Sequence, residues 1–343
     1  MEKMILGRTG LSVTRSGFGA LPVQRIPLED AANLLREAFE KGINYFDTAR
    51  AYTDSEEKIG KALSDVRDSI VISTKSHATT PQELRKHVET SLATMKTDYV
   101  DILQFHNPKK VFLPGEEDGM YDALAELKDQ GKVRFIGYTN HSLDRAMEAV
   151  RSGYYDTVQF PLNHLSAQRD VELVEECSKR NAGFIAMKGM SGGLITDARL
   201  SFAFLRQFDN VVPIWGMQKK SELEQFIELE AAPPSLEELQ DLIDEDRKAL
   251  SGDFCRSCGY CLPCPAGIDI PQAARMSLLL GRMPWQPFMS DEWRDKMEKI
   301  EDCIHCDHCK NHCPYGLDTP ELLRKNLVFY REFYREKTGK KLP

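Results

Sequence analysis

Residues 42–63, GINYFDTARAYTDSEEKIGKAL, contain the pattern that decides the fold. A short apolar run, Ile43–Phe46, is followed at once by a charged residue, Asp47. An amphipathic stretch over residues 28–40 precedes this run and is ended by Gly42, as is typical of a helix. A helix, a short apolar strand and a polar turn in this order form one repeat of a protein that alternates helices and strands.

The same repeat continues over the first 230 residues. Helical patterns at residues 81–92 and 221–229 lie between apolar runs, and runs that are apolar on both faces suit parallel strands covered by helices. Eight such runs recur about every 25–30 residues, as expected for a (β/α)8 barrel, at residues 16–21, 43–46, 70–73, 100–105, 133–138, 157–160, 183–187 and 211–215.

A doubly wound sheet is the alternative fold for an alternating pattern. The turn after the first strand, Gly17-Phe18-Gly19-Ala20, lacks the third glycine of the dinucleotide fingerprint that such sheets usually carry, so the barrel is favoured. Beyond the barrel, assigned to residues 1–230, the composition predicts a linker and docking helix over 231–254. A cysteine-rich module over 255–331 and a basic tail over 332–343 follow.

Composition narrows the possible partners and the location. The net charge of −8 argues against nucleic acid as a partner. No apolar run approaches the roughly 20 residues that a membrane span needs. The start, MEKMILGRTG, lacks the apolar stretch of a secretory signal, so we expect a cytoplasmic protein.

Ionisable residues end three consecutive predicted strands. Asp47 follows the second, Lys75 ends the third, His106 ends the fourth, and Tyr52 lies in the loop after Asp47. In such a barrel the chemistry lies at this rim, because the carboxyl ends of all strands meet there. One such residue alone is more often a helix cap or a surface charge, but four at consecutive strand ends predict a site.

The four residue types suit the reduction of a carbonyl group, which needs a hydride at carbon and a proton at oxygen. Tyr52 is the expected proton donor, with its pKa lowered by the ammonium of Lys75. Asp47 would keep Lys75 charged and oriented, and His106 would orient the carbonyl oxygen.

The sequence here resembles the aldo-keto reductases over about residues 3–230. The segments LGRTGLSVTRSGFGALP, GINYFDTARAYTDSEEKIGKAL, ISTKS and DILQFHNP resemble those that carry the family's first hairpin and its catalytic Asp, Tyr, Lys and His. The resemblance implies an NAD(P)H-dependent reductase acting on a small carbonyl compound. It also implies a nicotinamide cofactor bound across the barrel mouth without a Rossmann turn.

The resemblance also implies the cofactor site. Two lysines near the adenosine end can bind a 2′-phosphate, which favours NADP, but the Gln225-Phe226 there departs from the family's usual Glu-Asn and leaves NAD open. A mobile glycine-rich loop with a nearby lysine suits a pyrophosphate. The implied residues are Thr139 and Asn140 for the carboxamide, Gln159, Met187 at the nicotinamide ring, Lys188, Gly192 and Gly193 in the loop MSGGL, and Gly216, Met217, Lys219 and Lys220.

Eight of the nine cysteines form two motifs, each ending in Cys-Pro: Cys255, Cys258, Cys261, Cys264, and Cys303, Cys306, Cys309, Cys313. The second has the bacterial ferredoxin spacing and the first is one residue shorter, so they predict two 4Fe-4S clusters. By the ferredoxin rule the fourth cysteine of each motif, Cys264 or Cys313, binds the other cluster. Structural zinc is the alternative, but zinc usually takes two separated cysteine pairs.

The module resembles ferredoxin-like extensions of some aldo-keto reductases, and the pattern of residues 271–300 predicts that it is mostly helical. Nicotinamide exchanges two electrons as hydride, whereas a cluster passes one, and no flavin motif is visible. A ferredoxin or flavoprotein partner is therefore one expectation, and a structural or sensing role for the clusters is another. An electron-transfer or regulatory protein that binds nicotinamide without much turnover stays the alternative to a reductase.

Overall fold

The computed structural model describes residues 1–250, 254–340 and 342. The chain divides into two compact units. The first comprises Met1–Gly189 and Arg199–Arg247, and the second comprises Met190–Ala198 and Lys248–Pro343. The sequence assigned residues 190–198 to the barrel, but they form contacts chiefly within the second unit.

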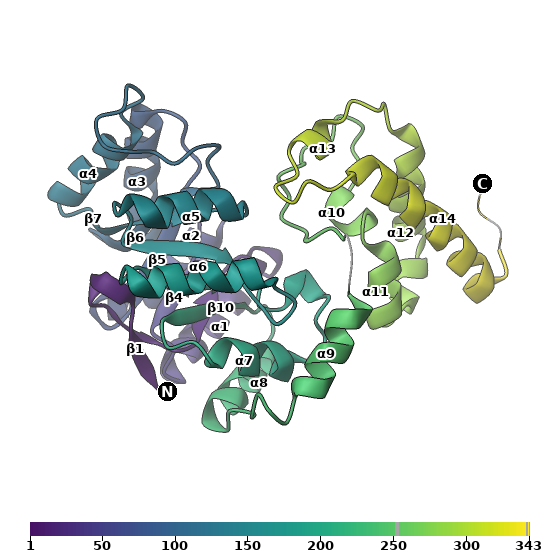
Figure 1. The fold of residues 1–343 in the computed structure, drawn as a ribbon, viewed down its shortest axis with the longest axis horizontal. Coiled ribbons are helices and arrows are strands. Elements are labelled where there is room, and N and C mark those ends of the chain that lie inside the picture. Colours follow the sequence, from purple (N-terminus) through teal and green to yellow (C-terminus); the bar gives the residue numbers. More distant parts are fainter. Residues whose placement is uncertain (251–253, 341, 343) are drawn as a thin grey trace. The chain divides into compact units, whose positions relative to one another are not determined.

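The first unit is built on a closed barrel of parallel strands (Figure 1). Each of the eight predicted strands is present, with bounds within three residues of those expected, so the predicted (β/α)8 fold is confirmed. The strands, which pair in the order β10-β3-β4-β5-β6-β7-β8-β9, are β3 (Gly17–Gly19), β4 (Tyr45–Asp47), β5 (Val71–Ser76), β6 (Val100–His106), β7 (Val133–Thr139), β8 (Thr157–Pro161), β9 (Gly183–Met187) and β10 (Val211–Gly216).

Helices surround this barrel, and the predicted bounds of α1 are exact (Figure 1). Helix α3 begins as its sequence predicts, because Pro81 occupies the first turn and the Thr80 side chain accepts a hydrogen bond from the Glu83 N–H. The helices are α1 (Leu28–Glu40), α2 (Ser55–Leu63), α3 (Pro81–Met95), α4 (Met120–Asp129), α5 (Leu143–Ser152), α6 (Gln168–Lys179), α7 (Ala198–Arg206) and α8 (Lys220–Ala231).

An antiparallel hairpin of β1 (Lys3–Ile5) and β2 (Ser12–Thr14) precedes the barrel. Its buried apolar residues, such as Val13, share one apolar cluster with Tyr45 and Ile102 from the barrel strands. Helix α9 (Gln240–Ala249) also adds to the first unit, because Ile243 packs in a cluster with residues of α7. A helix therefore lies where the sequence predicts a docking helix.

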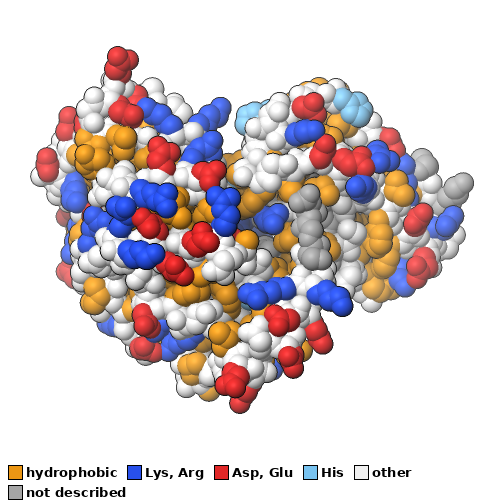
Figure 2. Space-filling view, in the orientation of Figure 1, with side chains coloured by type: hydrophobic (Ala, Val, Ile, Leu, Met, Phe, Trp, Pro, Cys, Tyr) orange, Lys and Arg blue, Asp and Glu red, His pale blue; other side chains and the backbone are white. Residues whose placement is uncertain are grey.

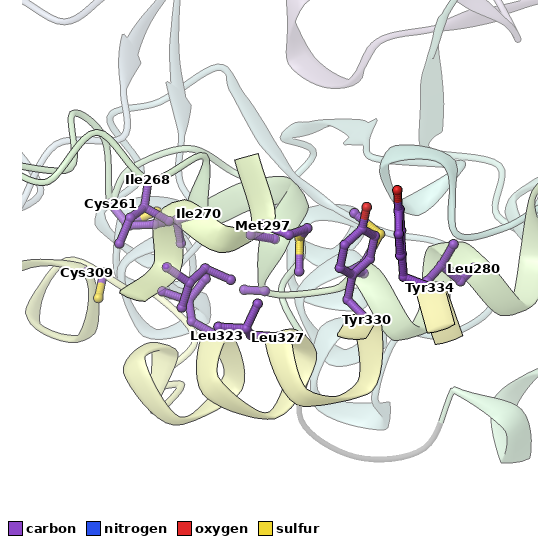
Figure 3. Packing of buried hydrophobic residues seen from close by; sticks show 14 residues of the cluster. Cys261, Ile268, Ile270, Leu280, Met297, Cys309, Leu323, Leu327, Tyr330 and Tyr334 are labelled. Atoms are coloured by element: carbon purple, nitrogen blue, oxygen red, sulfur yellow. The ribbon is translucent and has the colours of Figure 1, made fainter. Parts of the chain in front are cut away.

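The second unit is helical around one apolar core (Figure 3). Cys261 and Cys309 lie toward the same end of this core, near Ile268 and Ile270. Its helices are α10 (Ile270–Ala273), α11 (Met276–Arg282), α12 (Asp291–Glu298), α13 (His308–Asn311) and α14 (Thr319–Thr338).

Helix α14 extends past the boundary at residue 331 that the composition suggested. Tyr334 is buried in the core four residues after Tyr330, which continues the apolar stripe of Leu323 and Leu327. Side chains four residues apart lie on one face of a helix, so part of the expected basic tail belongs to the folded unit.

The visible surface of the first unit carries acidic and basic side chains interspersed with one another (Figure 2). On the second unit, histidine side chains appear at two separate places along the upper edge (Figure 2), and His305 and His312 are exposed. Among the residues that the structure describes, no helix is long and apolar enough to span a membrane.

Candidate active site

A buried ion pair joins the ends of two neighbouring strands. Asp47 ends β4, Lys75 lies near the end of β5, and their side chains are 2% and 1% exposed. The Lys75 ammonium donates to Asp47 Oδ1 and to the Thr48 carbonyl oxygen, 2.6 Å away. Because β4 and β5 are parallel neighbours, both groups reach the same rim of the barrel.

The other two predicted site residues lie against this pair. Tyr52 is half-buried in the loop between β4 and α2, and its ring centroid is 5.2 Å from Lys75 Nζ. His106, the last residue of β6, meets the Tyr52 ring edge-on with 5.8 Å between ring centroids. The structure thus brings together all four residues that the sequence singled out.

Burial opposes the ammonium in setting the pKa of the Tyr52 phenol. Removal from water raises this pKa, the charge of Lys75 lowers it, Asp47 raises it, and the hydrogen bond with Lys75 lowers it. The net effect is a raised pKa, whereas the sequence led us to expect a lowered one, because residue types do not reveal how deeply the phenol is buried. The phenol therefore carries its proton at neutral pH, as a proton donor must.

The pKa of His106 is lowered to about 3, chiefly by burial and then by the charges of Lys75 and His77. Its imidazole is therefore neutral at physiological pH. A neutral imidazole can donate one hydrogen bond to a carbonyl oxygen without placing a second positive charge beside Lys75.

Three supporting side chains escaped the sequence analysis. Ser73 Oγ donates to Asp47 Oδ2, Gln104 Nε2 lies 3.3 Å from the same oxygen, and the Tyr45 hydroxyl donates to Ser73 Oγ at 3.0 Å. All three are buried. A buried polar residue inside an apolar strand, such as Gln104 in VDILQFH, is the signal that could have revealed them.

The two residues expected at the carboxamide, Thr139 at the end of β7 and Asn140 directly after it, are buried. The Asn140 amide nitrogen already donates to the Pro108 carbonyl oxygen at 2.9 Å and to the Tyr138 hydroxyl at 3.1 Å. Gln159 Oε1 accepts from Gln104 Nε2 at 2.7 Å. Thr139 is paired in register with both His106 and Gln159, which places it in the same layer of the barrel.

The residues expected farther along the cofactor differ in their surroundings. Met187 and Lys188 lie at the end of β9, and Gly216 ends β10. Met217 is completely buried. The two lysines, Lys219 and Lys220, are exposed at the start of α8, and Lys220 Nζ lies 2.8 Å from a carboxylate oxygen of Glu37. Gly192 and Gly193 belong to the second unit.

Cysteines of both motifs come together in the second unit. A small pocket, partly open to solvent, is lined by Cys264 of the first motif and by Cys303, Cys306 and Cys309 of the second. Burial raises the pKa of the Cys309 thiol, two backbone N–H groups lower it, and the neighbouring Cys303 and Cys264 raise it further.

A second group of cysteines forms within the first motif. The pKa of Cys261 is raised to about 12 by burial and by the neighbouring Cys255 and Cys258. Apolar surroundings and crowded thiols disfavour several thiolates unless a metal compensates their charge. The donor set therefore fits thiolate-bound iron.

Two buried polar atoms of the barrel site also bear on ligand binding. His106 Nδ1 and Gln104 Oε1 have no hydrogen-bond partner among the described residues. Unsatisfied buried polar atoms are rare and concentrate at sites that bind a further group. This end of the barrel therefore fits a bound polar ligand such as a nicotinamide cofactor or a carbonyl substrate.

Fold and site together define an oxidoreductase on a (β/α)8 barrel that is joined to an iron–sulfur module. The aldo/keto reductase family model matches residues 13–211, and a 4Fe-4S dicluster domain model matches residues 254–318. The chain belongs to the aldo-keto reductase family.

The sequence of the barrel is similar to those of several oxidoreductases. L-galactose dehydrogenase of Arabidopsis thaliana is 32% identical over 216 residues, which cover 57% of this chain and 68% of that enzyme. The NADH-specific methylglyoxal reductase of Escherichia coli is 27% identical over 228 residues, which cover 57% of this chain and 69% of that enzyme.

Solved structures show the same fold. The holo form of an aldo-keto reductase from Bacillus halodurans has a TM-score of 0.64 and 21% identity, and the match covers 74% of this chain and 98% of that one. An aldo-keto reductase from Klebsiella pneumoniae in complex with NADPH has a TM-score of 0.63 and 21% identity, covering 72% and 96%.

Proposed function

We propose that this protein reduces an aldehyde or ketone to an alcohol with NAD(P)H. The observation that carries the proposal is the buried Asp47–Lys75 pair with Tyr52 and His106 against it. A buried ion pair is weak evidence for a stabilising role, which favours a chemical role for these charges. When bound, the nicotinamide would supply the hydride.

The chain's own residues would bind the oxygen of the carbonyl group and protonate it. Neutral His106 would donate a hydrogen bond to this oxygen and fix its position. Tyr52 would give its phenolic proton to the oxygen as negative charge develops there. The phenolate left behind would be stabilised by the Lys75 ammonium, which Asp47 holds in place.

Replacement of Tyr52 by Phe tests this proposal. The variant should lose turnover by at least about a hundredfold, the lower end of general acid catalysis, while it binds NADPH with unchanged Kd. Tyr154→Phe, at an exposed tyrosine elsewhere on the barrel, is the matched control and should keep full activity. NADPH oxidation against a panel of aldehydes and ketones measures both, and an active Tyr52→Phe enzyme would refute the assignment.

Of the two nicotinamide cofactors we favour NADP. The support comes from the exposed Lys219 at the start of α8, since Lys220 is already engaged with Glu37. Lys219→Ala should raise the KM for NADPH and leave that for NADH unchanged, because only NADPH carries the 2′-phosphate. Equal effects on both cofactors would argue against this contact.

For the second unit we propose two 4Fe-4S clusters with crossed ligation. One would be bound by Cys264, Cys303, Cys306 and Cys309, as the shared pocket supports, and the other by Cys255, Cys258, Cys261 and Cys313.

Single serine substitutions test the crossing. Cys264→Ser should damage the same cluster as Cys306→Ser and spare the one that Cys258→Ser damages, as seen by iron and sulfide content and by EPR of the reduced, anaerobically purified protein. Loss of the same EPR signal in Cys264→Ser and Cys258→Ser would show uncrossed ligation.

Electron exchange with a ferredoxin or flavoprotein is the second candidate function. The observation that favours it is the exposure of Ile304 and Cys306 at the edge of the cysteine pocket, where a cluster would lie close to the surface. A partner would also supply the change from one-electron to two-electron transfer. Stopped-flow reduction of the clusters by a reduced ferredoxin, with carbonyl turnover absent, would favour this function over the reductase.

A further inference from the structure

Two histidines and a glutamate that the proposed reaction does not use lie close together at the start of α3. His77 follows directly after β5, and Glu83 and His87 stand four residues apart in α3, on the same face of the helix. One possible ligand atom from each of the three side chains lies within 4.8 Å of those of the other two. All three residues belong to the first unit.

The carboxylate of Glu83 is held in a fixed orientation. Its Oε2 accepts a hydrogen bond from the Thr79 N–H at 2.8 Å, and the Glu83 N–H donates to the Thr80 hydroxyl oxygen at 3.3 Å. The two contacts resemble a capping box, in which a glutamate and a threonine satisfy each other's part of the helix start. The other carboxylate oxygen, Oε1, is directed toward His87.

The imidazole of His87 is oriented through its other ring nitrogen. Its Nδ1 shares a hydrogen bond of 2.8 Å with Ser76 Oγ, which is the kind of contact that usually fixes a metal-binding histidine. Its Nε2 faces Glu83 Oε1 at 3.8 Å, which is too long for a hydrogen bond. Two ligand atoms of one tetrahedral Zn²⁺ lie about 3.4 Å apart. The spacing therefore suits two ligands of one ion better than a direct contact.

His77 supplies the third group, from the exposed side of the cluster. Its ring centroid lies 4.8 Å from that of His87, and the two rings are tilted by 48°. Imidazole and carboxylate are ligands that Zn²⁺ commonly takes in proteins. Three protein ligands would leave the fourth tetrahedral position to water or a small anion, and the exposure of His77 gives an ion access from solvent.

We propose that His77, Glu83 and His87 bind a divalent transition-metal ion, of which Zn²⁺ is the best match. The site is distinct from the cysteine motifs, because it offers nitrogen and oxygen ligands and lies in the first unit. A bound ion would lie near the rim of the barrel that carries Lys75, since His77 follows Lys75 by two residues. The proposal does not depend on carbonyl reduction.

Equilibrium dialysis of Zn²⁺ against the anaerobically purified holoprotein, with metal content measured by mass spectrometry, tests the proposal. Wild-type protein should bind zinc at this site, and His77→Ala, Glu83→Gln and His87→Ala should each raise the Kd at least about tenfold. Glu83→Gln keeps an oxygen that can accept the hydrogen bond from Thr79. Glu89→Gln, at an exposed glutamate of the same helix, is the matched control and should bind zinc as wild type does.

X-ray absorption at the zinc edge separates this site from the cysteines, which can also bind zinc. Zinc on imidazole and carboxylate has neighbours at about 2.0–2.2 Å, whereas zinc on cysteine has sulfur at about 2.3 Å. Zinc bound only through sulfur in the wild-type protein, or a wild-type Kd in all three variants, would overturn the inference.

His77→Ala also guards against misfolding as the cause of weaker binding. The side chain of His77 is exposed, so the variant should keep the circular dichroism spectrum and the iron content of wild type while its zinc Kd rises. The outcome for Tyr52→Phe decides the reductase proposal separately, and neither experiment determines the result of the other.

Discussion

Disruption of the Asp47–Lys75 pair should destabilise the barrel as well as stop catalysis. Removing one member of a buried pair leaves the other charge uncompensated, which typically costs about 3–5 kcal/mol. In Lys75→Met the Asp47 carboxylate keeps its hydrogen bonds from Ser73 and Gln104, so we expect a loss near the lower end, about 3 kcal/mol. Asp47→Asn should cost less, because the Lys75 ammonium still donates to Thr48.

The double variant measures the coupling between the two charges. The variant Asp47→Asn/Lys75→Met buries neither charge. Its free energy of unfolding should therefore decrease by about 2 kcal/mol less than the sum of the decreases in the two single variants. Urea unfolding followed by the fluorescence of Trp215, which is buried in the barrel, isolates the first unit once Trp285 and Trp293 are replaced by Phe. If the decrease in the double variant equals the sum of the two single decreases to within about 0.5 kcal/mol, the two charges are not coupled and the reasoning is refuted.

Two further predictions concern pH and packing. Burial raises the pKa of Tyr52, and the pKa of His106 is lowered to about 3. The rate of carbonyl reduction should therefore be constant from about pH 5 to pH 9 and fall only at the higher pH at which Tyr52 loses its proton. A fall in this rate near neutral pH would contradict the prediction. Gly137→Ala should cost about 1–3 kcal/mol in thermal unfolding, because the new Cβ would lie 2.7 Å from Gln104 Cγ. Gly281→Ala has open space and is the control.

The barrel could be predicted because its signals are local. Each strand is a short apolar run, and α1 ends at a residue pair, Lys41-Gly42, in which Gly42 takes a φ of +99° that favours glycine. The end of the second unit was harder, because the charged residues around Tyr334 suggest a solvated tail. Only the position of Tyr334 on the same helical face as Leu327 reveals that the helix continues into the core.

That the four candidate site residues lie together could be predicted for a topological reason. Parallel strands bring their carboxyl ends to one rim, so residues at strand ends meet whatever the exact register. Ser73 and Gln104 could not be found in this way, because their role depends on register: Asp47 pairs with Ser73, and Lys75 pairs with Gln104. The packing of the glycine-rich loop depends on Arg275 and Arg282, more than 80 positions away, and no local pattern announces it.

Crossed cluster ligation would join the two ends of the cysteine-rich module. Cys264 and Cys303 are separated by 39 positions, and a metal that joins them closes a long loop, which restricts the unfolded chain more than the folded one. Cys261 and Cys309 lie in the apolar core, so removal of iron would leave buried thiols in place of the metal–sulfur bonds. The two cysteine loops would then lose the cross-links that fix their shape.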